Sequence, residues 1–130
     1  KKKMNIGEAA NQAGLPVKTV RYYSDIGLVS PSYRSASGYR NYDSTSVKKL
    51  IFVKRARSFD FSIEDCRELL DLYQDKNRTS SNVRRIAKEH LIRIQRKESE
   101  LKNLRLELNH LVKACAGDDR PDCPIIDYFS

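Results

Sequence analysis

The apolar residues of the first 25 positions recur with the period of short amphipathic helices. One helical pattern runs over residues 5–13 and a second over residues 17–25. Between them, Gly14 supplies a left-handed turn conformation, and Pro16 suits the first position of a new helix. Two short helices joined in this way predict a helix-turn-helix unit.

The pattern changes over residues 30–42, where proline, glycine and small residues exclude a helix and arginines alternate with tyrosines. This segment predicts a hairpin wing. Helical periodicity resumes near Asp43 and continues to about Ser58, and a fourth helix begins after the capping residue Ser62. Residues 4–73 are therefore expected to form one winged helix-turn-helix domain with its connecting helices.

A polar break precedes a long helical pattern from Ser80 to about Ala114, which fits a heptad repeat. His90 and Lys97 interrupt the apolar rows, where they either fix the register or extend their polar ends to solvent. A helix of about 34 residues is roughly 50 Å long, too long for a small domain to cover. We therefore expect residues 80–114 to pair with a second copy in a homodimer. The two rows are Ala87, Ile94, Leu101 and Leu108, and Val83, His90, Lys97, Leu104 and Leu111.

Composition agrees with a mainly α-helical, cytoplasmic protein. The chain has 130 residues, of which 39% are hydrophobic and 32% charged. Its apolar runs all fall well short of the roughly 18 residues of a membrane span, and its basic start is followed by no apolar signal segment. The three cysteines are therefore expected to be thiols.

The positive charge is concentrated in one half of the chain. Residues 1–58 contain 12 Lys and Arg against 3 Asp and Glu, whereas the net charge of the whole chain is +8. Charge alone fits a solvated basic surface as well as a polyanion site, but the helix-turn-helix pattern favours double-stranded DNA. Tyr23 also fits a core position. The candidate DNA contacts are Lys18, Thr19, Arg21, Tyr22, Tyr23, Arg34, Tyr39, Arg40 and Arg57.

Residues 115–130 carry the candidate metal chemistry. Cys115 follows the long helix, and Cys123 precedes a short helical pattern that begins at Pro124, where exposed backbone amides favour a thiolate. Two soft sulfur donors suit a monovalent d10 ion such as Cu(I). The spacing alone fits a disulfide or two inert thiols equally well. Cys66 has no cysteine nearby in sequence and is expected to be a passive thiol.

From Met4 onward the chain resembles the MerR family of transcription regulators. The resemblance rests on Arg21-Tyr22-Tyr23, Gly27-Leu28-Val29, Arg34, Gly38-Tyr39-Arg40 and Tyr42. It implies an antiparallel dimer of the long helices. It also implies binding to promoter DNA with an over-long spacer, which is distorted so that RNA polymerase can engage both promoter elements.

The segment from Cys115 to Ile126 is similar to the metal loop of CueR-type copper-efflux regulators, which implies Cu(I), and also Ag(I) or Au(I), as the effector. Ser80 occupies the place where the family's divalent-metal sensors have a third cysteine, and it also suits a helix cap. We expect Arg84, one turn later, to supply positive charge near the site. Zinc or mercury, oxidation, or an organic ligand are the alternative effectors. The sequence shows no pattern typical of an enzyme site.

Overall fold

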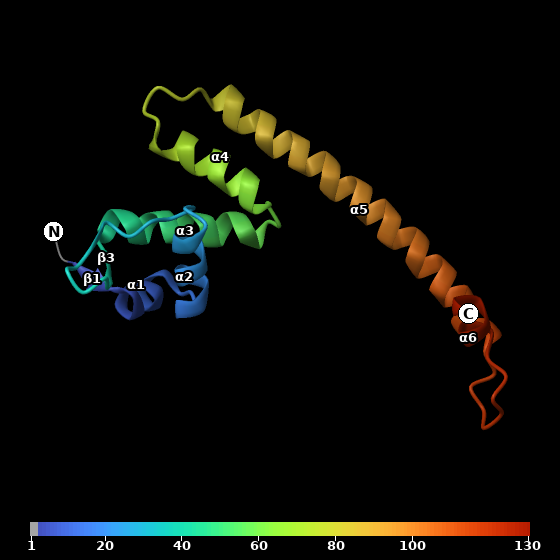
Figure 1. The fold of residues 1–130 in the computed structure, drawn as a ribbon. Coiled ribbons are helices and arrows are strands. Elements are labelled where there is room, and N and C mark those ends of the chain that lie inside the picture. The colour runs from blue at the N-terminus through green and yellow to red at the C-terminus, as the bar shows by residue number, and fades with distance from the viewer. Residues whose placement is uncertain (1–2) are drawn as a thin grey trace. The chain divides into compact units, whose positions relative to one another are not determined.

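The computed structural model describes residues 3–130 and is mainly helical (Figure 1). Lys1 and Lys2, which precede the start of the family resemblance, lie outside the described residues. The chain forms two compact units, the first ending at Ile86 and the second covering Ala87–Ser130. The elements are β1 (Met4–Asn5), α1 (Ile6–Ala13), α2 (Val17–Asp25), β2 (Tyr33–Arg34), β3 (Arg40–Tyr42), α3 (Ser44–Ser58), α4 (Ile63–Gln74), α5 (Ser80–Ala114) and α6 (Pro124–Phe129).

The first two helices form the predicted helix-turn-helix. Asn5 caps α1 through a capping box in which its side chain accepts from the Glu8 amide and the Glu8 side chain accepts from the Asn5 amide. Gly14 ends α1 with φ of 70°, and its amide bonds back to the α1 carbonyls. Val20, on the inner side of α2, is fully buried against the core.

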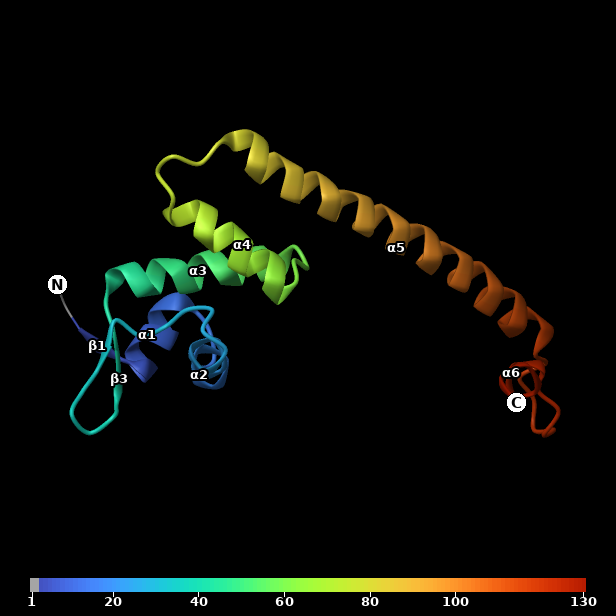
Figure 2. The same ribbon diagram turned by 45° about the horizontal axis from the view of Figure 1, so that its top comes forward.

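A small antiparallel sheet with the order β1-β3-β2 lies beside α1, and Figure 2 labels its strands β1 and β3. The hairpin of β2 and β3 is the predicted wing, with Tyr33 opposite Asn41 and Arg34 opposite Arg40. Strand β1, in which Met4 pairs with Tyr42, was not expected from the sequence. A two-residue strand is too short to show alternation, and the helical pattern of residues 5–13 already includes Asn5.

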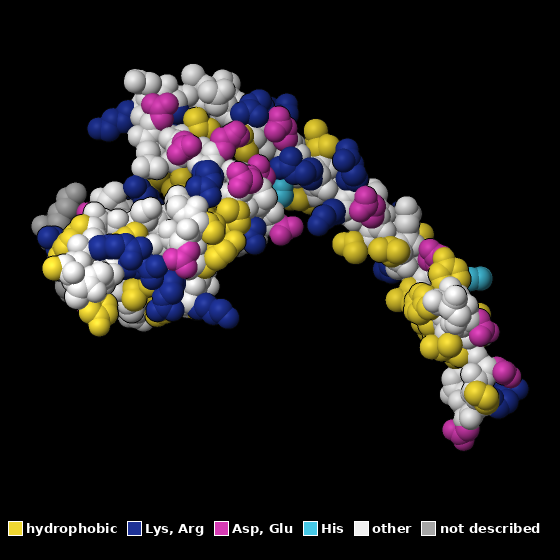
Figure 3. All heavy atoms as spheres, viewed as in Figure 1, with side chains coloured by type: hydrophobic (Ala, Val, Ile, Leu, Met, Phe, Trp, Pro, Cys, Tyr) yellow, Lys and Arg dark blue, Asp and Glu magenta, His cyan; other side chains and the backbone are white. Residues whose placement is uncertain are grey.

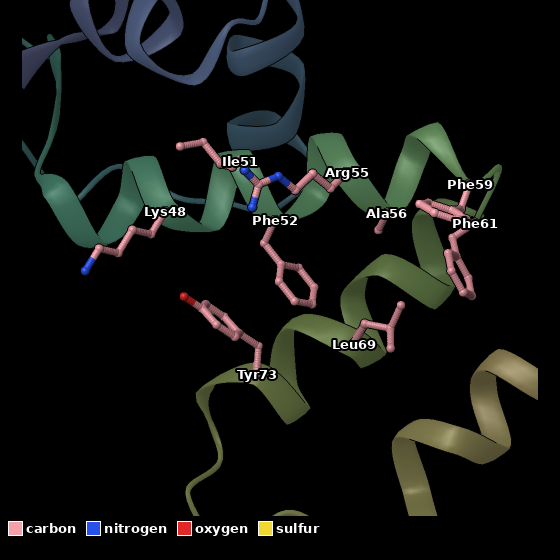
Figure 4. Close-up of a pocket in the computed structure, with 9 residues that line it drawn as sticks. All are labelled: Lys48, Ile51, Phe52, Arg55, Ala56, Phe59, Phe61, Leu69 and Tyr73. Atoms are coloured by element: carbon pink, nitrogen blue, oxygen red, sulfur yellow. The ribbon is translucent and has the colours of Figure 1, made fainter. Parts of the chain in front are cut away.

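Helices α3 and α4 belong to the same unit, in which α3 packs against α1 and α4 packs against α3. Asp43 caps α3 and Ser62 caps α4, as their positions in the sequence predict. Between the two helices lies an open, mostly apolar pocket of about 540 Å³, in which the rings of Phe52 and Tyr73 stack 4.7 Å apart (Figure 4). The core of the first unit includes Met4, Ala9, Ala10, Ala13, Val20, Tyr23, Leu28, Val29, Tyr42, Val47, Leu50, Val53, Cys66 and Leu70.

The second unit contains most of α5 and the short helix α6. Many apolar side chains of α5 are exposed here, including Leu101 at 64% and Leu104 at 61% (Figure 3). Helix α6 returns to α5, because the Tyr128 hydroxyl donates to Glu107 and Phe129 lines a groove with Leu108 and other α5 residues. None of the helices formed by residues 3–130 has the length and apolar character needed to cross a membrane.

Candidate metal centre and nucleic-acid interface

Helix α2 presents four of the nine predicted DNA-contacting residues at its surface. Lys18, Arg21 and Tyr22 are exposed, and Thr19 is half-buried. Tyr23 departs from that prediction, because only 6% of it is exposed and its ring belongs to the core. Burial raises the pKa of the Tyr23 hydroxyl. Because its ring is buried, Tyr23 supports α2 from the core side. The prediction that Tyr23 contacts DNA is therefore not supported by its position.

The wing presents a second polar surface in the same unit. Its tip is closed by the Ser35 amide, which donates to the Tyr39 carbonyl at 2.9 Å, and Tyr39 itself is 74% exposed. Arg34 is exposed, as a phosphate contact requires. Arg40 instead places Nη2 2.7 Å from Oδ1 of Asp25, with 18% of its side chain exposed.

Two further arginines donate hydrogen bonds to backbone carbonyls in turns of the first unit. Arg57 is exposed, yet its Nη1 donates to the Phe61 carbonyl at 2.6 Å, so it closes the turn between α3 and α4. Arg67 of α4 donates from Nη1 to the Gly27 carbonyl and from Nη2 to the Ile26 carbonyl, each at 3.1 Å. Sequence reasoning missed Arg67, because its bonds reach backbone groups about 40 residues away and leave no local signal.

The candidate metal centre lies in the second unit. Cys115 follows the last turn of α5, and Cys123 is the N-cap residue of α6. The loop between them brings the two Sγ atoms to 3.8 Å, and both side chains are half-buried. Both are free thiols, since this separation far exceeds a disulfide bond of about 2.05 Å. The structure therefore brings together the two residues that the sequence proposed as a pair.

The start of α6 favours the thiolate form of Cys123. The backbone amide of Ile126, followed by that of Ile125, lowers the pKa of this thiol, although neither makes a complete capping hydrogen bond to it. The Cys115 thiol lowers this pKa further, whereas desolvation and, to a smaller extent, the nearby Asp127 oppose the shift. A lowered thiol pKa is the condition under which sulfur is a good metal ligand near neutral pH.

The loop itself is organised by a short-range ion pair. Gly117 adopts φ of 65° directly after Ala116, and Arg120 then folds back onto Asp118, with Nη2 2.7 Å from Oδ2. The same guanidinium lowers the pKa of Asp118. Asp118 is thus engaged within the loop.

The donor set fits a soft ion of low coordination number. Across residues 3–130 there is no group of three or more His, Cys, Asp or Glu side chains arranged to hold a metal. His110 is exposed on α5. A closed zinc site normally has four ligands, whereas two thiolates suffice for a monovalent d10 ion.

Ser80 and Arg84 begin α5 and are both exposed. They belong to the first unit, whereas the two thiols belong to the second. Their role beside the thiols of a second subunit stays a prediction.

The sequence and structure match those of known regulators. The family model described as MerR HTH family regulatory protein matches residues 4–73, and the model described as MerR, DNA binding, matches residues 47–111. The HTH-type transcriptional regulator HmrR of Rhizobium leguminosarum bv. viciae is 56% identical over 98% of both chains. CueR of Salmonella typhimurium is 41% identical over 98% of this chain and 92% of its own.

Among solved structures, the transcription regulator PbrR691 from Ralstonia metallidurans CH34, in complex with lead(II), superposes with a TM-score of 0.84. It is 30% identical and covers 98% of this chain and 99% of its own. These relatives are transcription regulators, which confirms the prediction that the chain is not an enzyme. The chain belongs to the MerR family of helix-turn-helix transcription regulators.

Proposed function

We propose that this chain is a metal-responsive transcription regulator that activates copper-efflux promoters when Cu(I) binds to Cys115 and Cys123. The observation that carries the proposal is the pair of free thiols with Sγ atoms 3.8 Å apart. Metal sensing as the broader function is supported by the relative named heavy metal-dependent transcription regulator 2 of Rhizobium meliloti and by PbrR691, which was solved with lead(II). Ag(I) and Au(I) share the preference of Cu(I) for sulfur and are expected to bind as well.

Helix α6 is the element that metal binding would order. Cys123 caps α6 and Cys115 ends α5, so an ion shared by the two sulfurs fixes the start of α6 relative to the end of α5. Tyr128 and Phe129 then hold the other end of α6 in the groove on α5. A ligand that favours one arrangement shifts the equilibrium between two states of the regulator.

The response requires a homodimer acting on promoter DNA. The exposed leucines of the two heptad rows, Leu101, Leu104 and Leu108, pair with those of a second subunit in an antiparallel arrangement, in the cytoplasm where the promoter and RNA polymerase lie. Ser80 of the partner subunit adds no third thiolate, and Arg84 of the partner subunit offsets the net negative charge of a Cu(I) dithiolate. Bending and untwisting of an over-long spacer is the proposed output.

A second candidate is the same regulator with another metal as its effector. The specific observation in its favour is PbrR691, the structural relative solved with lead(II). The two-sulfur donor set favours the monovalent ion over this alternative, because divalent ions call for further ligands.

Competition titration under anaerobic conditions tests the metal assignment. The purified protein is titrated with Cu(I) against a chromophoric Cu(I) chelator, and with Zn(II) against a zinc chelator. We expect one Cu(I) per chain, with zinc far weaker. Cys115→Ser should abolish tight Cu(I) binding, and the matched control Cys66→Ala should retain it. Tight zinc binding, or Cu(I) binding that survives Cys115→Ser, would overturn the assignment.

A further inference from the structure

One ion pair connects the wing to the end of α2. Arg40, on β3, lies 2.7 Å through Nη2 from Oδ1 of Asp25, the last residue of α2. Fifteen residues separate the two in sequence. Arg40 is thus the residue through which the wing makes a charge-assisted bond to α2.

The surroundings of Arg40 differ from those of a phosphate ligand. Only 18% of its side chain is exposed, and its Nε is buried. A carboxylate already occupies one edge of the guanidinium and would compete with a DNA phosphate. Since the ion pair is neutral as a unit, it would release few counterions from DNA on binding.

The register of the hairpin explains why this pairing is useful. Arg34 and Arg40 lie directly opposite each other on β2 and β3. Like charges at such positions destabilise a strand pair. Asp25 neutralises the positive charge of Arg40. Arg34 can therefore stay exposed on the opposite strand with little repulsion from Arg40.

The hydroxyl groups of Tyr42 and Ser24 are buried near the ion pair. Tyr42 on β3 is fully buried, and neither its hydroxyl nor that of Ser24 on α2 makes a hydrogen bond of good geometry. The two hydroxyls are nevertheless neighbours, because Ser24 lowers the pKa of Tyr42 against the larger effect of burial. Hydroxyl groups that do not complete a hydrogen bond connect α2 to β3 only weakly. The ion pair between Asp25 and Arg40 is therefore the stronger connection.

We propose that Arg40 is a positioning residue that fixes the wing against α2 through Asp25, and that Arg34 is the wing arginine that binds phosphate. This inference rests on the proposed DNA-binding function. It revises the role that the sequence assigned to Arg40, since Arg40 affects DNA affinity by holding the wing in place.

Salt-dependent DNA binding separates the two roles. Fluorescence anisotropy is measured at several salt concentrations, with a duplex that the wild-type protein has selected from a random-sequence pool. Arg34→Gln, the matched control, should reduce the slope of log affinity against log salt by about 0.9, the value for one lost phosphate contact. Arg40→Gln should weaken binding about tenfold at every salt concentration and leave the slope unchanged.

Asp25 supplies the decisive partner variant. Asp25→Ala should weaken binding by the same factor as Arg40→Gln, and the double variant should lose no more than either single variant. Circular dichroism confirms that each variant is folded at the assay temperature. If the pair served folding alone, the folded variants would bind as tightly as the wild type, which would overturn the proposal.

Two other results would also overturn it. One is a slope reduction by Arg40→Gln of half or more of the Arg34→Gln effect. The other is tighter binding by Asp25→Ala, which would show that Asp25 merely competes with phosphate for Arg40. Failure of the wild-type protein to select any duplex would instead refute the proposed DNA-binding function.

Discussion

Cys66 and Cys123 lie in contrasting electrostatic settings. Cys66 is fully buried, and burial raises the pKa of its thiol. Cys123 begins α6, where the Ile126 and Ile125 amides lower the pKa of its thiol. A lowered pKa means that the thiolate is populated at lower pH than in an unfolded chain, and a raised pKa means the reverse. Cys123 is thus both more accessible than Cys66 and activated by its surroundings.

This contrast predicts selective alkylation. In metal-free protein treated with iodoacetamide at a series of pH values, Cys123 should reach half-maximal reactivity at a lower pH than it does in urea-unfolded protein. Cys66 should stay unmodified while the protein is folded, because burial excludes the reagent. Peptide mass spectrometry measures both.

The unfolded protein is the control, since Cys66 and Cys123 should then react alike. A midpoint for Cys123 that is equal in folded and unfolded protein, or higher in the folded protein, would show that the start of α6 does not stabilise its thiolate.

Many apolar side chains of helix α5 are exposed in the single chain. Leu101 is 64% exposed and belongs to a heptad row, whereas Leu106 is 50% exposed and lies outside both rows. The two leucines are similarly exposed in the single chain but differ in heptad position. Substitutions at these two positions can therefore be compared directly. If the rows form a dimer seam, only Leu101 is buried by the second subunit.

Leu101→Glu should therefore weaken dimerisation about a hundredfold or more, because a two-fold interface loses two buried leucines. Leu106→Glu should leave the dimer intact. Analytical ultracentrifugation over a range of concentrations measures both. Equal effects of the two substitutions would place the interface elsewhere on α5.

The sequence predicted most elements because their signals are local. Gly14 marks the end of α1, and the capping residues Asp43 and Ser62 mark the starts of α3 and α4. The structure places these helix boundaries where the sequence predicts them. The contacts between α2 and its neighbours were not predictable in this way. Asp25 meets Arg40, and Arg67 meets the carbonyls after α2, only once the chain has folded. The burial of Tyr23 has the same cause, since a Tyr-Tyr pair leaves open which ring faces the core.

At the scale of the whole molecule, charge and soft-metal chemistry are divided along the chain. The excess of Lys and Arg lies in residues 1–58, whereas the paired thiols lie beyond residue 114. The first region has the character of a DNA-binding surface, and the second holds the proposed metal site. A regulator must couple them, so metal occupancy at the thiols should change the output at the promoter.

In vitro transcription from the promoter that the protein recognises tests this coupling directly. With RNA polymerase present, Cu(I) should activate transcription by the wild-type protein, Zn(II) should not, and Cys115→Ser should respond to neither while still binding the promoter. Activation by zinc, or copper activation that survives Cys115→Ser, would contradict a Cu(I)-responsive two-thiolate regulator.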